Sequence, residues 1–147
     1  MRKYKINPIK EGDILEIYVD GASRGNMGPS SCAFIFVKGT DIIYQNSEYI
    51  GEATNNIAEY QAIINALKEA EKFSRWHLKV YSDSELVIRQ INKIYRIKAK
   101  HLSQLCAEVY GLCGKYKNVE FFHVNREHHF IKKSDELCNK YLNEKGF

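Results

Sequence analysis

The sequence has no long apolar stretch. Its longest uninterrupted apolar run, Cys32 to Val37, is far shorter than the roughly 20 residues that span a bilayer, and the N-terminus lacks the apolar core of a signal peptide. These absences predict a soluble, cytoplasmic protein that has no contact with a membrane. The chain also has no internal repeat, no low-complexity tract and no proline-rich linker, so nothing divides it into parts.

The length and composition suit one domain. At 147 residues, of which 44% are hydrophobic, the chain can bury one core but is too short for two ordinary domains. We predict a polar, basic leader over residues 1–13 and a single domain over residues 14–147. We expect a monomer that uses no organic cofactor.

The four cysteines do not form a metal or disulfide pattern. Cys32, Cys106, Cys113 and Cys138 contain no C-x-x-C pair, and the spacing of seven between Cys106 and Cys113 puts both on one helical face. Buried thiols are therefore favoured over zinc ligands or a disulfide framework. A disulfide that uses Cys138 stays open.

The positive charge lies mainly in the last third of the chain. Residues 1–92 carry 11 Lys/Arg against 12 Asp/Glu, whereas residues 93–147 carry 11 against 6 and hold four of the five histidines. A polyanion would find its positive counter-surface mainly in this last third, although a solvated lysine-rich face explains the charge equally well.

The apolar spacing changes between alternating and helical along the chain. Strands are expected at residues 14–20, 32–37, 42–50, 78–81 and 119–124, and helices at 55–73, 84–92, 98–116 and 133–143. Three strands before the first helix predict an antiparallel meander, and the alternating elements that follow predict parallel strands reached through helical crossovers. The expected fold is α/β, a mixed five-stranded sheet with helices on its faces.

Four acids lie where separate segments begin or end. Asp20 and Asp83 each follow a strand, whereas Glu59 and Asp135 lie near the starts of expected helices. Ligands of open α/β sheets bind beyond the carboxyl ends of strands, and neighbouring strands are about 4.8 Å apart, so adjacent strands would let Asp20 and Asp83 share a metal. Four carboxylates would be balanced by two Mg²⁺ ions. The pattern indicates a site for phosphoryl transfer.

Each acid also has a purely structural explanation. Glu59 and Asp135 suit the first turn of a helix, and Asp83 lies inside Ser82–Glu85, which matches a capping box. Asp20 could form a turn. The glycine-rich segment 21–29 matches neither the Rossmann nor the phosphate-loop spacing, so it is read as a flexible hairpin loop over 21–31 or as a source of donors for a nucleic-acid backbone.

Four motifs in order resemble type 1 ribonuclease H. They are YVDGASRGNMGP at 18–29, TNNIAEYQA at 54–62, YSDS at 81–84 and SDEL at 134–137, and the resemblance runs from about residue 14 to residue 143. The resemblance implies a ribonuclease H-like fold and an endonuclease that cuts the RNA strand of an RNA–DNA hybrid with two Mg²⁺ or Mn²⁺ ions. The products would carry 5′-phosphate and 3′-hydroxyl ends.

The resemblance also implies roles for individual residues. Asp20 would bridge both metals, Asp83 would help hold the metal that activates the attacking water, and Glu59 and Asp135 would hold the other. His128, or its neighbour His129, could help to protonate the leaving group.

Contacts with the hybrid follow from the same resemblance. Amide groups can read the 2′-hydroxyl that distinguishes RNA from DNA. Asn26, Asn55 and Asn56 match positions that face the minor groove, Thr54 matches a DNA-phosphate contact, and Arg24 is a plausible phosphate partner. Glu85 stands where the family often has Gln, and an ionised carboxylate can accept from a 2′-hydroxyl but cannot donate. The basic segment 93–100 is short, which predicts weak and salt-sensitive hybrid binding.

Two other functions compete with this interpretation. A nuclease of the same superfamily could instead resolve branched DNA or transfer DNA strands, but Asn26, Asn55 and Asn56 argue against a DNA substrate. A non-catalytic binding module would use only the basic last third. It would gain nothing from four clustered acids, because these would repel the polyanion.

Overall fold

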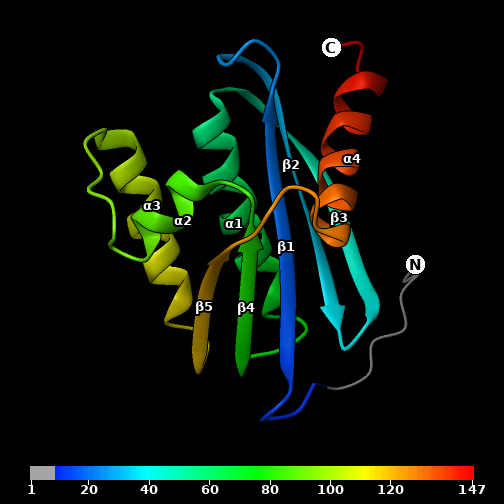
Figure 1. The fold of residues 1–147 in the computed structure, drawn as a ribbon, viewed down its shortest axis with the longest axis vertical. Coiled ribbons are helices and arrows are strands. Elements are labelled where there is room, and N and C mark those ends of the chain that lie inside the picture. Colours follow the sequence, from blue (N-terminus) through cyan, green and yellow to red (C-terminus); the bar gives the residue numbers. More distant parts are fainter. Residues whose placement is uncertain (1–8) are drawn as a thin grey trace.

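The computed structural model describes residues 9–147 (Figure 1). The expected leader, residues 1–13, lies largely outside the described residues, and the domain boundary at residue 14 stays a prediction. Within the described part of that stretch, Ile9 is buried in the main core. The strands are β1 (Ile14–Ser23), β2 (Gly28–Lys38), β3 (Asp41–Ala53), β4 (His77–Ser82) and β5 (Asn118–His123). The helices are α1 (Asn55–Ala70), α2 (Glu85–Ile91), α3 (Lys100–Cys113) and α4 (His129–Glu144).

The five strands form one mixed sheet in the order β3-β2-β1-β4-β5. β1 pairs with β2 and β2 with β3 in antiparallel fashion, whereas β4 lies parallel to β1 and β5 parallel to β4. The expected meander, extended by two parallel strands through helical crossovers, is therefore confirmed. Because β1 and β4 are adjacent and parallel, the acids near their carboxyl ends, Asp20 and Asp83, can lie close together.

Helices cover both faces of the sheet. Successive side chains of a strand point to opposite faces, so Leu15, Ile17 and Val19 of β1 join the large core beneath α1, α2 and α3. Tyr18 points the other way and packs with Ile131 of α4 in a smaller core. Figure 1 shows α4 lying across the antiparallel part of the sheet, away from the other three helices.

The connection between β1 and β2 is shorter than the predicted loop over 21–31. The two strands remain paired as far as Ser23 and Ser30, which leaves only residues 24–27 to turn the chain. Gly25 and Asn26 both have positive φ, at 86° and 49°, a conformation that Gly and Asn adopt most readily. The segment is a tight hairpin rather than a flexible loop.

The helix α1 brings small side chains to the sheet. Ala58, Ala62, Ala66 and Ala70 are fully buried along one face, as the helical spacing of the sequence predicts. Their size allows the helix backbone to approach β1 closely. The helix ends at Ala70, before the predicted residue 73, and the residues that follow form a turn.

The last helix begins earlier than the predicted residue 133. Its N-cap is His128, whose Nδ1 accepts a hydrogen bond from the Phe130 backbone N–H at 3.2 Å. The extra turn buries Ile131 in the smaller core, and this burial stabilises the start of the helix. Asp135 therefore lies inside α4, beyond its first turn.

The four cysteines are unpaired in the structure, and its helices are not of the membrane-spanning kind within the described residues. All four cysteines are free thiols; Cys32, Cys106 and Cys138 are buried and Cys113 is half-buried, so the expectation of buried thiols holds and the open disulfide is not formed. Within residues 9–147, none of the helices has both the length and the apolar character that crossing a membrane requires.

Candidate active site

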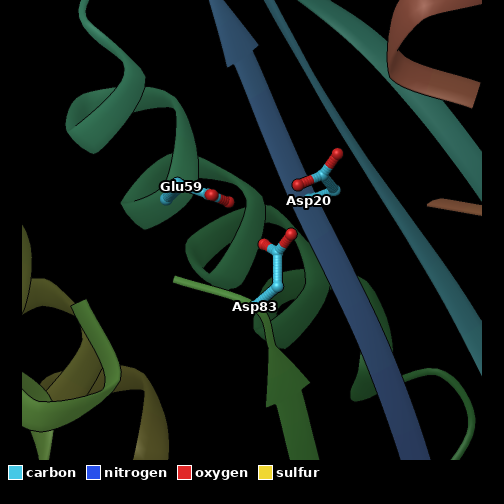
Figure 2. Close-up of side chains that lie close together, drawn as sticks. All are labelled: Asp20, Glu59 and Asp83. Carbon is cyan, nitrogen blue, oxygen red and sulfur yellow. The ribbon is translucent and has the colours of Figure 1, made fainter. Parts of the chain in front are cut away.

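Three acids from three different elements meet at one point above the sheet. Asp20 lies near the end of β1, Asp83 directly follows β4, and Glu59 reaches them from α1 (Figure 2). One carboxylate oxygen from each lies within 4.8 Å of the others. Asp20 and Asp83 meet because β1 and β4 are parallel neighbours. The alternative role of Asp20 in a turn is wrong, since the strand continues to Ser23.

The fourth predicted acid lies beside this group but outside the closest three. Asp135 comes from α4 on the other side of β1 and forms part of the wall of the same cleft. Its carboxyl is close enough to Asp20 to raise the pKa of that residue. Asn139, one turn later, donates its amide N–H to Asp135 Oδ1 at 3.1 Å, which orients the exposed carboxylate.

The capping roles considered for the acids are wrong. The first turns of α1 and α4 contain no acid, because Glu59 and Asp135 both lie further inside their helices. Asp83 precedes the N-cap of α2, which is Ser84: its hydroxyl accepts from the Val87 backbone N–H at 3.4 Å. None of these three acids caps a helix, so a structural role of that kind does not account for them.

The acids are costly to hold as anions in this position. Burial and the negative charges of Glu59 and Asp83 raise the pKa of Asp20 well above its ordinary value. Burial and Asp83 raise the pKa of Glu59 to about 8, against the opposing effect of a hydrogen bond from the Gly21 N–H. Burial also raises the pKa of Asp83 above its ordinary value. The positive charge of Arg126, whose Nε lies 3.8 Å from Asp83 Oδ2, opposes this rise. A cation in the cluster would remove most of this cost.

The donor set fits a divalent metal of the magnesium type. Mg²⁺ and Mn²⁺ prefer oxygen ligands, and among the described residues the cluster brings together carboxylate oxygens alone. The cleft around it has a volume of about 530 Å³, which leaves room for water and a phosphodiester. A metal ion could be held directly by Asp20, Glu59 and Asp83. Asp135 could contribute to the site of a second ion.

Two of the predicted asparagines are fixed in a defined orientation. Asn26 Oδ1 accepts from the Asn55 backbone N–H at 2.8 Å, and Asn55 Oδ1 accepts from the Ser23 backbone N–H at 3.0 Å. Both carbonyl oxygens are thus engaged, and the NH₂ groups of these two exposed side chains keep their capacity to donate. Asn55 and Asn56 line the cleft next to the acids. Thr54 caps α1, its hydroxyl accepting from the backbone N–H of Ile57.

The structure gives Arg24 and Glu85 partners within the protein. The guanidinium of Arg24 donates to Asn143 Oδ1 at 2.7 Å and to the Asn139 carbonyl at 3.4 Å, which ties the hairpin to α4. Glu85 is exposed and accepts from Arg89 Nε at 2.8 Å one turn along α2. Contacts of Arg24 and Glu85 with nucleic acid stay predictions, because each side chain would have to exchange or share its partner.

His128 has a structural role that the sequence did not reveal. Besides capping α4, its ring stacks on Tyr18 at a centroid distance of 5.0 Å. His128 lies outside the set of described residues that line the acidic cleft, and its neighbour His129 packs against Phe130 instead. A part for His128 in catalysis stays a prediction that these contacts do not support.

Several charged residues of the cleft were missed by sequence reasoning. Arg126 and Glu127, in the turn before α4, and Lys132, in its first turn, form one wall of the cleft. Lys132 and Glu127 form an ion pair at 3.6 Å. The only signal in the sequence was the density of charge in this turn, since nothing in the spacing showed that α4 would bring it to the acids.

Comparison with known proteins agrees with this arrangement. Residues 18–140 match a family described as reverse transcriptase-like. The chain is 32% identical over 134 residues to ribonuclease HI of Halobacterium salinarum, covering 90% of this chain and 66% of that protein. It is 30% identical to ribonuclease H of Thermoanaerobacter pseudethanolicus, covering 89% of this chain and 84% of the relative. The chain belongs to the ribonuclease H family.

Solved structures place this ribonuclease H-family chain among the same relatives. The crystal structure of Halobacterium salinarum RNase H1 superposes with a TM-score of 0.85 at 32% identity, covering 89% of this chain and 98% of that one. LC11-RNase H1, solved in complex with an RNA/DNA hybrid, superposes with a TM-score of 0.84 at 32% identity, covering 90% and 99%. The chain spans 66% of the full Halobacterium relative and 34% of a Mycobacterium tuberculosis relative described as a bifunctional protein.

Proposed function

We propose that this protein is an endonuclease that hydrolyses the RNA strand of RNA–DNA hybrids with two divalent metal ions, Mg²⁺ or Mn²⁺. The observation that carries the proposal is the meeting of Asp20, Glu59 and Asp83 within 4.8 Å, with Asp135 beside them. The family of the chain supports it, as does the hybrid bound to the structural relative LC11-RNase H1. We further propose that the products carry 5′-phosphate and 3′-hydroxyl ends, and that the protein acts in the cytoplasm as a monomer.

The acids would serve as metal ligands from both sides of β1. Asp20 is the central acid in the sense that its carboxyl interacts with those of Glu59, Asp83 and Asp135. When bound, two divalent ions would supply an activated water and stabilise the leaving oxygen of the phosphodiester. The remaining task of the protein is to hold the scissile phosphate in line, for which Arg126 and Lys132 provide positive charge in the cleft.

The asparagines would select the strand to be cut. The NH₂ groups of Asn26 and Asn55 can donate to the 2′-hydroxyl or to the acceptors at base edges in the minor groove, and Asn56 lies next to Asn55 in the cleft. Because the carbonyl oxygens are already engaged, the orientation of these donors is set before substrate binds. Thr54 and Arg24 would contact phosphates, and Glu85, whose Oε2 accepts from Arg89, could accept from a 2′-hydroxyl with its other oxygen.

Cleavage of a defined hybrid tests the proposal. Purified protein is mixed with a duplex whose RNA or DNA strand is end-labelled, in Mg²⁺, in Mn²⁺ or in EDTA. We expect cuts in the RNA strand alone, only with metal, and abolished by Asp20→Asn in a protein that still unfolds cooperatively. Absence of cleavage at every metal concentration would overturn the proposal.

The same assay separates the competing functions. Comparable cutting of all-DNA duplexes or branched DNA would favour the DNA-directed nuclease, against which the three asparagines argue. Hybrid binding without cleavage and without sensitivity to divalent metal would favour the binding module. The raised pKa of Glu59 argues against that module, since a binder of polyanions would gain nothing from holding these acids together.

A further inference from the structure

Gly21, the residue after the central acid, lies in close contact with the backbone of α1. A Cβ atom at this position would lie 2.3 Å from the Ala58 carbonyl carbon and 2.5 Å from the Glu59 nitrogen. The φ angle of Gly21 is not in the positive range, so residues other than glycine could adopt its backbone conformation. The requirement for glycine here is therefore one of space. The obstructing atoms are backbone, so no change of side-chain rotamer can relieve the overlap.

The same glycine also holds the catalytic carboxylate that faces it. The Gly21 backbone N–H donates to Glu59 Oε1 at 2.8 Å. This bond fixes one oxygen of Glu59, in a side chain that extends from α1 toward Asp20 and Asp83 (Figure 2). Close approach and hydrogen bond have one common result: they set where Glu59 stands relative to Asp20.

We propose that Gly21 is a positioning residue that sets the spacing and orientation of Asp20 and Glu59 as metal ligands. The inference rests on the proposed two-metal function and deepens it. Any larger residue must push β1 and α1 apart at the point where the two acids project. Mg²⁺ holds its oxygen ligands at about 2.0–2.1 Å in near-ideal octahedral geometry, so a displacement on the order of 1 Å would remove Glu59 from the site.

The proposal makes a prediction for the variant Gly21→Ala. Far-UV circular dichroism and a thermal melt in EDTA should show a cooperatively folded protein, because Gly21 lies beyond Tyr18, the last residue of β1 that pairs with β4. Calorimetric titration should show Mn²⁺ binding weakened by at least about tenfold, as for loss of a ligand's supporting group. The kcat for hybrid cleavage should fall by roughly 100-fold, as a 1 Å displacement can cause, with KM little changed. Metal affinity and kcat equal to the parent would overturn the proposal.

A double-mutant cycle shows whether Gly21 acts through Glu59. If it does, Gly21→Ala should weaken Mn²⁺ binding strongly in the parent and hardly at all in a Glu59→Gln background. Equal losses in both backgrounds would mean that Gly21 does not position Glu59. Gly111→Ala is the matched control, since a Cβ there meets no atom within 4 Å, and it should bind metal and cleave hybrid like the parent.

One measurement on the parent keeps the proposal testable if Gly21→Ala does not fold. The Gly21 amide resonance in a ¹H–¹⁵N spectrum should shift on Mg²⁺ addition and move upfield in Glu59→Ala, which lacks the acceptor. A resonance insensitive to both changes would overturn the proposal. Failure of the proposed function looks different: the parent itself would then bind no divalent metal and cut no hybrid.

Discussion

Replacing the central acid should make the metal-free protein more stable while it destroys activity. Asp20 is only 5% exposed and lies within 4.8 Å of carboxylate oxygens of Glu59 and Asp83. Two full charges at that distance repel by about 3.5 kcal/mol at an effective dielectric constant of about 20. Part of this repulsion is already avoided by the raised pKa values, so we expect Asp20→Asn to add roughly 2 kcal/mol to the free energy of unfolding near pH 8.

Thermal denaturation in EDTA measures this gain. For a chain of this length, ~2 kcal/mol corresponds to a rise in Tm of about 4–8 °C. Saturating Mg²⁺ should reduce or reverse the difference, because only the parent gains the full free energy of metal binding. Glu85→Gln is a suitable control, since this acid is exposed and, within residues 9–147, forms its ion pair with Arg89; the Tm of this variant should hardly change. An Asp20→Asn protein no more stable than the parent in EDTA would refute the charge-repulsion argument.

Three further outcomes are expected. Glu59 has a pKa of about 8 in the folded protein and an ordinary value of 4.5, so the stability it contributes without metal is complete below about pH 4.5 and is lost as the pH rises toward 8. Melts in EDTA should therefore show a Tm that falls over this range more steeply in the parent than in Glu59→Gln; parallel curves would contradict the shift. Tyr60→Phe removes the 2.8 Å donor to the buried Gln90 Oε1 and should cost about 1–3 kcal/mol in urea denaturation without changing cleavage by the folded enzyme. Asn55→Ala removes the proposed donor to the hybrid and the acceptor for the Ser23 N–H. It should raise KM for hybrid with Mn²⁺ affinity unchanged, a result that weaker metal binding would contradict.

Much of the fold was accessible from periodicity. The alternation of Leu15, Ile17 and Val19 marked a strand with one face on a core, and the alanines of α1 marked a helix that packs closely. Boundaries were less accessible because they depend on contacts distant in the sequence. The start of α4 is the clearest case, since the cap at His128 and the packing of Ile131 on Tyr18 extend the helix by a turn.

The candidate site divides in the same way. The four acids and the asparagines could be named from motifs, but the motifs could not say that Asp135 would stand beside the closest three rather than among them. Nor could they show that Arg24 would be tied to α4 or that Arg126 would enter the cleft. These facts depend on how α4 crosses β1, which no local pattern records.

By itself, the sequence determined the chemistry available to this protein: carboxylates after strands, amides at a helix start, and no thiol pattern or apolar span to suggest another function. These are properties of residue type and local spacing, so they survive in a linear reading. Only the tertiary structure decided which groups share a volume, because the parallel pairing of β1 with β4 and the close approach of α1 at Gly21 join residues far apart in the chain. Charge repulsion and metal binding depend on distances of a few ångströms, and those distances are set by packing alone.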